Sequence, residues 1–212
     1  SFLNMSSALS LIEDSKEEVK KLAGLGEQVK ELEKMISDSE NKILKKEEKN
    51  YAEFFDLTVD DKNAKGNKLY LNDDRLLVSD KEKGILYKLS LDKKSLDKDQ
   101  SSEIKKSSLI AIFEEKKYFY VEGAGVYQII DGKTKKIIEN DKEWGKIVDL
   151  AIFNGNIYLL DQGKNDIRKY MTTESGCGGG TSYFQLGQSI NLSSVNSLTI
   201  DGSVYLAGDS VM

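Results

Sequence analysis

Three carboxylate side chains could act together in a catalytic site, because each follows an apolar, aromatic-rich strand. They are Asp80, Glu122 and Asp161. If their strands belong to successive sheets around one axis, the carboxylates could converge at a central channel, as a lyase or hydrolase of the propeller class requires. The same positions begin turns, where Asp and Gly are expected for backbone reasons alone. We therefore predict no catalytic residue and keep the enzyme as an alternative.

Other kinds of chemistry are limited by residue types. The chain has no histidine, which excludes Ser-His-Asp and Cys-His catalysis and zinc sites that use imidazole. The single cysteine, Cys177, rules out an internal disulfide, and no base or basic cluster lies near it in sequence to lower its pKa. The acidic loop 161–166 lacks the pattern of a calcium loop, and the glycine-rich stretch 176–180 lacks the Lys-Ser/Thr of a phosphate loop. We predict no metal and no cofactor, and an exposed flexible loop at 176–180.

Composition restricts the class of protein further. The chain has 212 residues, of which 39% are hydrophobic and 32% charged, so it can bury a core in one or two globular parts. A net charge of -5 argues against a general nucleic-acid binder, because phosphate neutralisation needs a positive surface. No apolar window approaches the length of a membrane span, and no secretory signal is present. Because the chain begins at Ser1 and stops within an apparent repeat, we expect it to be a piece of a longer protein.

Residues 1–49 have the composition of helix, rich in Glu, Lys, Leu and Ala. Gly24 and Gly26 weaken the helix, which predicts a helix-helix turn there, with one kinked helix as the alternative. An apolar stripe at spacings of three and four residues is typical of a coiled-coil seam. This predicted seam consists of Leu22, Leu25, Val29, Leu32 and Ile36. We favour a coiled coil, which would make a homo-oligomer, or a helical hairpin, over a helix lying on its own domain.

Residues 50–212 change to short strands separated by Gly, Asn and Asp. A strand ending in Asp or Gly recurs about every 40 residues, a period typical of propeller blades. Four antiparallel units are predicted, at 68–91, 109–138, 148–171 and 197–207. The fold is therefore expected to be mainly β, with the helical segment followed by a partial β-propeller of about four units, the last incomplete. Residues 54–59 are predicted as a strand that could close the ring.

Aromatic residues recur at strand positions, where they are predicted to pack between blades. Trp144 differs because it sits in a connecting segment. It is the one aromatic side chain that we predict as a surface anchor.

Two stretches carry a resemblance to a known group of proteins. Residues 147–161 with 165–170, and residues 198–206, are similar to blades of bacterial propellers. They resemble in particular the C-terminal propeller of membrane-anchored proteins that also carry a PPM-type phosphatase-like domain, a transmembrane helix and a helical coiled segment. This resemblance implies membrane association through a segment absent from this chain, with the chain itself soluble. It transfers no catalytic residue, because the phosphatase part is absent.

The sequence thus predicts a non-catalytic protein-interaction or sensing module, with a propeller presented on a helical stalk. The expected partner is a protein or peptide, and no nucleic acid is expected. The alternatives are a propeller-class enzyme with a site at the central channel, and a structural spacer.

Overall fold

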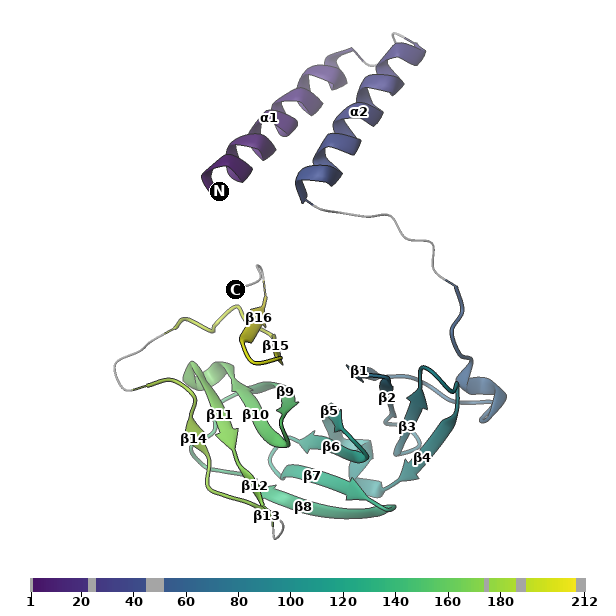
Figure 1. Ribbon diagram of the computed structural model, residues 1–212, viewed down its shortest axis with the longest axis vertical. Helices are drawn as coiled ribbons and strands as arrows, with labels where there is room; N and C mark the ends of the chain where they lie inside the picture. The colour runs from purple at the N-terminus through teal and green to yellow at the C-terminus, as the bar shows by residue number, and fades with distance from the viewer. Residues whose placement is uncertain (1, 23–25, 45–51, 174–175, 186–189, 209–212) are drawn as a thin grey trace. The chain divides into compact units, whose positions relative to one another are not determined.

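The computed structural model describes residues 2–22, 26–44, 52–173, 176–185 and 190–208. They form two compact units, Ser1–Phe54 and Phe55–Met212. The first is helical and the second is built from antiparallel sheets (Figure 1). The sequence placed the boundary between residues 49 and 50.

The helical unit is a hairpin of two helices, α1 (Phe2–Lys21) and α2 (Glu27–Leu44), which pack against each other. An ion pair joins them, with the Lys16 ammonium 2.8 Å from a Glu40 carboxylate oxygen. Val19 and Val29 are the buried side chains of the hairpin among the residues described. The alternative of one kinked helix is therefore wrong, whereas a coiled coil between chains stays a prediction. Neither helix, as far as it is described, has the length and apolar character needed to cross a bilayer.

In its described residues the second unit contains three sheets of four antiparallel strands and two of two strands. The first sheet has β1 (Lys68–Asn72), β2 (Arg75–Asp80), β3 (Ile85–Ser90) and β4 (Leu96–Gln100). The second has β5 (Ser107–Phe113), β6 (Lys116–Val121), β7 (Gly125–Ile130) and β8 (Lys133–Glu139). The third has β9 (Ile147–Phe153), β10 (Asn156–Asp161), β11 (Asp166–Tyr170) and β14 (Thr181–Ser182), and the fourth has β15 (Ser197–Ile200) and β16 (Val204–Ala207).

Short irregular elements complete the described part of the unit. Three are 3₁₀ helices: η1 (Leu57–Val59), η2 (Ser102–Lys106) and η3 (Gln162–Lys164). In the chain, a small hairpin of β12 (Thr172–Thr173) and β13 (Gly176–Cys177) follows β11 and precedes β14. Turns join consecutive strands within the four-stranded sheets, except between β11 and β14. Asn154-Gly155 is an example, because both residues have positive φ (48° and 76°), as the sequence signal for a hairpin predicts.

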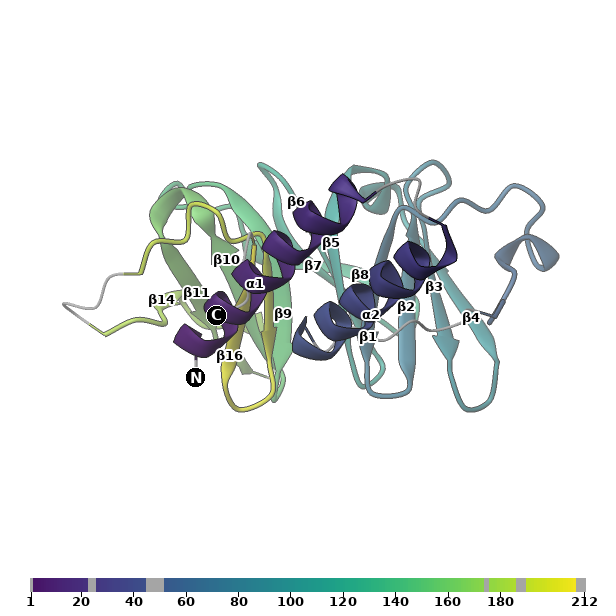
Figure 2. The same ribbon diagram turned by 90° about the horizontal axis from the view of Figure 1, so that it is seen from above.

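The sheets follow one another in chain order, so that the second lies between the first and the third (Figure 2). Their first strands are neighbours, with β5 between β1 and β9, and β9 next to β15. Apolar side chains fill the space between facing sheets, because each strand presents alternate residues to each face. Ile110, Ile112 and Phe119 lie in the cluster between the first and second sheets, whereas Leu150 and Leu159 belong to that between the second and third.

The outer face of the first sheet is covered by residues 55–64, which we call the cap segment. Phe55, Leu57 and Ala64 pack against a cluster that includes Val78 and Tyr87. The predicted strand at 54–59 is therefore wrong. The Asp56 carboxylate accepts hydrogen bonds from the Thr58 amide (2.8 Å) and hydroxyl (2.7 Å), and this local turn starts η1 instead.

Polar contacts also hold the cap segment on the sheet. The Asp61 carboxylate pairs with the Lys83 ammonium and lies 3.3 Å from the Tyr87 hydroxyl. Asp60 pairs with Lys98 of β4 at 2.9 Å. These contacts tie the cap to two strands and to the turn between β2 and β3.

Two further expectations for the sheets need correction. β4 was not predicted from the sequence because its residues are mostly charged, although it pairs with β3 in regular register. The glycine-rich stretch is also predicted from the sequence as a flexible loop. Part of that stretch, Gly176–Cys177, instead forms β13.

Candidate functional site

Asp80 and Asp161, two of the three candidate carboxylates, have a structural role. Both are fully buried. One oxygen of Asp80 accepts a hydrogen bond from the Lys65 amide (2.9 Å) and the other from the Lys83 amide (3.0 Å). Asp161 likewise accepts from the amides of Gly145 (2.9 Å) and Lys164 (3.1 Å). Each aspartate therefore ties the chain that enters its sheet to the turn that follows its own strand.

Glu122 does not belong to this pair. In the third sheet Asp161 pairs with Ile147, the first residue of the neighbouring strand β9. In the second sheet the residue that pairs with the first residue of β5, Ser107, is Val121. Val121, and not Glu122, is therefore the structural equivalent of Asp161. Glu122 lies beyond the strand and is exposed. The three carboxylates therefore do not form one matched set. Within the described ranges no cluster of three His, Cys, Asp or Glu side chains is arranged to hold a metal.

Trp144 packs inside the second unit. Its indole N–H donates a hydrogen bond to the Tyr170 hydroxyl at 2.7 Å, and its ring meets that of Tyr170 edge-on, with centroids 6.2 Å apart. The centroid of the Tyr120 ring lies 6.0 Å from that of the Trp144 ring. Burial raises the pKa of Tyr170, and the hydrogen bond from Trp144 acts in the opposite direction. The side chain is half-buried and joins two sheets, so the interpretation as a free surface anchor needs correction.

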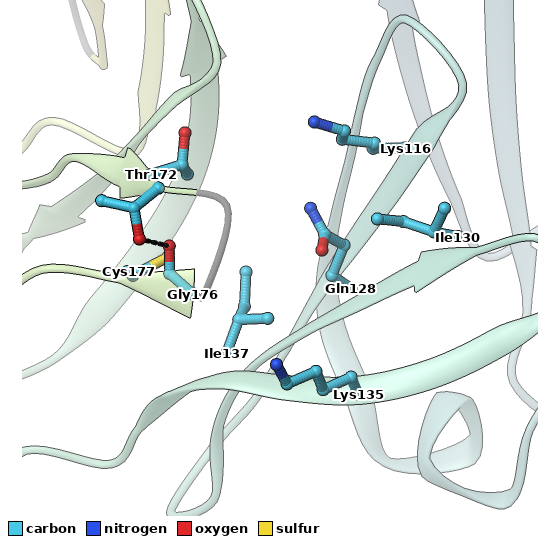
Figure 3. A pocket seen from close by; sticks show the side chains of 9 residues that line it. Lys116, Gln128, Ile130, Lys135, Ile137, Thr172, Gly176 and Cys177 are labelled. Atoms are coloured by element: carbon cyan, nitrogen blue, oxygen red, sulfur yellow. Dashed lines mark hydrogen bonds between the residues drawn. The ribbon is translucent and has the colours of Figure 1, made fainter.

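A pocket of about 450 Å³ opens between the second and third sheets (Figure 3). One wall is formed by side chains of β6, β7 and β8, and the other by the hairpin β12–β13. The lining residues are Lys116, Gln128, Ile130, Lys135, Ile137, Thr172, Thr173, Gly176 and Cys177. This volume lies in the range of small-ligand sites, about 300–1,000 Å³.

The hairpin that forms one wall of the pocket is an insertion found in the third sheet and not in the first two. In the first and second sheets a short turn joins the third strand to the fourth, whereas in the third sheet the hairpin β12–β13 is inserted there. Both threonine hydroxyls of this wall donate to backbone carbonyls, Thr172 to Gly155 (2.8 Å) and Thr173 to Gly176 (3.1 Å). The hairpin is thus fixed by its own polar groups, and an insertion on a regular scaffold is a common location for a binding function.

Cys177 lies at the base of this pocket, half-buried against the core between the two sheets. Burial raises the pKa of its thiol, which disfavours the thiolate needed for nucleophilic chemistry. Tyr118 lies nearby, and its pKa is raised mainly by burial, while a hydrogen bond to Gln128 acts to lower it. Sequence reasoning missed this pocket because its residues come from two separate stretches of the chain.

The predicted helical seam is only partly covered within the hairpin. Val29 is buried, and Ile36 lines a shallow groove between α1 and α2. Leu22 and Leu32 remain 41% and 43% exposed. Leu25 lies outside the described residues.

The second unit is thus a mainly β domain of successive antiparallel sheets with one pocket-forming insertion. No protein-family model and no curated protein matches the chain. Solved structures that resemble it include a Bacteroides thetaiotaomicron protein of unknown function, with 18% identity over 69% of this chain and 43% of that one, and a TM-score of 0.49. A protein described as a gluconolactonase has 15% identity over 68% of this chain and 57% of its own, with a TM-score of 0.47.

A third similar structure is the nidogen/laminin complex, with 11% identity over 66% of this chain, 54% of that chain and a TM-score of 0.48. The chain therefore spans little more than half of that structure and of the gluconolactonase. The gluconolactonase and the Bacteroides protein are β-propeller-like. These similarities concern the fold and assign no activity.

Proposed function

We propose that the chain is a non-catalytic protein-interaction module that binds a protein or peptide partner on its sheet domain. The observation that carries this proposal is the hydrogen bonding of Asp80 and Asp161. Both oxygens of each carboxylate accept a hydrogen bond from a backbone amide. A general acid or base needs a free oxygen within hydrogen-bond reach of the reacting group. The pocket between the second and third sheets instead offers ammonium, amide and apolar groups, which suit binding.

The arrangement of the sheets supports a partial propeller as the binding platform. The first strands of successive sheets are neighbours, and apolar faces pack between sheets, as they do between blades. Membrane association and a link to PPM-type phosphatase-like proteins remain proposals based on the sequence resemblance alone.

The helical hairpin is proposed to pair with a second copy of the chain. The two helices have 20 and 18 residues, and two valines are buried among their described side chains. Isolated helices of this length are marginal in water, so a partner would stabilise them. Leu22 and Leu32 leave apolar surface available for a partner helix. Light scattering on the full chain is expected to show a dimer that dissociates in the double variant Leu22→Glu/Leu32→Glu. A dimer that persists in this variant contradicts the pairing.

Selection of phage-displayed peptides on the immobilised full chain tests the binding function. We expect a recurrent peptide sequence, whose binding to the chain is then measured by calorimetry. In parallel, the chain is assayed with panels of lactones and glycans, with and without divalent metal ions. The proposal is overturned if no peptide binds the chain, or if the chain turns over any of these substrates.

A further inference from the structure

In the pocket between the second and third sheets, the described side chains that carry ammonium or amide donors come from one wall. Lys116, Gln128 and Lys135 extend from the second sheet toward the hairpin β12–β13 (Figure 3). On the facing wall the Thr172 and Thr173 hydroxyl hydrogens are donated to backbone carbonyls. No acidic side chain is among the described residues that line the pocket. Among the described lining residues, the Lys116 ammonium is therefore a positive group that faces whatever enters the pocket.

Lys116 is the cation most clearly available to a ligand. Its neighbour Lys117 is buried and paired with Asp97 and Asp99, in a network that joins the first and second sheets. Lys88, on the first sheet, is paired with Glu115 and Asp97. Lys116 points to the opposite face of the strand and is exposed, and it forms no ion pair with any residue in the described ranges.

The remaining lining residues give the pocket an apolar base. Ile137 and Cys177 pack against the core between the sheets, and Ile130 lies at the rim with 39% of its surface exposed. A ligand group that carries a negative charge on a short methylene chain matches this combination. A glutamate side chain is such a group, since its carboxylate can meet Lys116 while its methylenes contact the apolar base.

From these contacts we infer that the pocket binds a carboxylate side chain of an acidic peptide, with Lys116 as the main cation. The inference rests on the proposed function, because it names the chemistry of the partner. Phosphate recognition is disfavoured, since phosphopeptide sites use clusters of arginine and no arginine is among the described residues that line the pocket. A free dicarboxylate has the same chemistry as the peptide side chain, and the test separates these two sources.

Cys177 provides a specific reporter, because it is the only cysteine in the chain and it lines the pocket. The rate of its reaction with the neutral reagent N-ethylmaleimide is measured on the full chain. The probes are an acetylated, amidated hexaglutamate peptide, the matching hexaglutamine peptide, and glutarate. We expect hexaglutamate at ten times its Kd to slow the reaction about tenfold, because about one site in eleven then stays free. Hexaglutamine and glutarate are expected to leave the rate unchanged.

Lys116→Gln should abolish the protection, whereas Lys142→Gln, an exposed lysine outside the pocket, should retain it. Circular dichroism establishes that both variants are folded. The inference is overturned if hexaglutamate does not protect Cys177, if hexaglutamine protects equally, or if protection survives in Lys116→Gln. Protection by glutarate at the same concentration overturns the assignment to a peptide. If selected peptides bind the chain without protecting Cys177, the site is wrong and the proposed function stands; if no peptide binds at all, the function itself fails.

Discussion

Asp161 offers a direct measure of how much the aspartate ties contribute to stability. In Asp161→Asn the side chain keeps its shape but has one acceptor oxygen for the amides of Gly145 and Lys164. One amide is left without a partner in a buried position, which costs about 1–3 kcal/mol. The other exchanges a charge-assisted hydrogen bond for a neutral one, a loss of about 1 kcal/mol. The free energy of unfolding should therefore fall by about 3 kcal/mol.

For a domain of about 150–250 residues this loss corresponds to a decrease in Tm of about 6–12 °C. Urea unfolding at pH 7 measures it, followed by circular dichroism and by the fluorescence of the single tryptophan, Trp144. Asp131→Asn is the matched control, because Asp131 is exposed and its positive φ of 49° is one that asparagine tolerates. If Asp161→Asn loses less than about 1 kcal/mol, or no more than Asp131→Asn, the structural role argued from the buried hydrogen bonds is refuted.

Three further predictions concern the packing of the sheets. Gly125→Ala should destabilise the chain by more than about 2 kcal/mol in urea unfolding, because a Cβ there would lie 2.1 Å from the Ile138 carbonyl oxygen at a φ of 119°; Gly123→Ala, with open space around it, should cost about 1 kcal/mol. Trp144→Phe and Tyr170→Phe should each cost about 1 kcal/mol, and a double variant that costs the full sum would show that their hydrogen bond contributes nothing. Burial and the nearby Asp61 and Asp80 carboxylates raise the pKa of Tyr87 to about 12, above the value near 10 of an unfolded tyrosine. Because the folded state keeps Tyr87 neutral, the stability that this tyrosine contributes is full below pH 10 and is lost as the pH rises toward 12. Unfolding followed by circular dichroism should therefore show that Tyr87→Phe loses less stability than the unaltered chain between pH 10 and 12. An equal loss in both proteins contradicts the assignment.

The strand positions could be predicted from sequence where apolar periodicity and turn residues agreed. The run from Ile157 to Asp161 after Asn154-Gly155 is one example, since both the turn and the alternation point to a hairpin. β4 could not be found in this way, because it is an edge strand whose charged residues pair through their backbone and carry little apolar signal. Such charges are typical of edges that must avoid further pairing.

The candidate site was less accessible to sequence reasoning. Glu122 was matched to Asp80 and Asp161 by its place after a strand, but register, which decides the match, depends on the pairing of whole strands. The roles of Asp80 and Asp161 as turn residues were predicted, although their second hydrogen bonds, to the chain before each sheet, were not. The pocket itself required the approach of the β12–β13 hairpin to the second sheet, and no local pattern contains that information.

The cap segment also affects how the domain can fold during synthesis. It precedes the first sheet in the chain, and each later sheet packs against the one before it. During synthesis, each new sheet therefore leaves the ribosome when the sheet that it packs against has already been made. A nascent chain can add sheets in order of translation, and the first apolar face has its cover available before it forms. This order shortens the time for which an unpartnered sheet is exposed to other chains, which is the interval when multi-sheet proteins are most prone to aggregate.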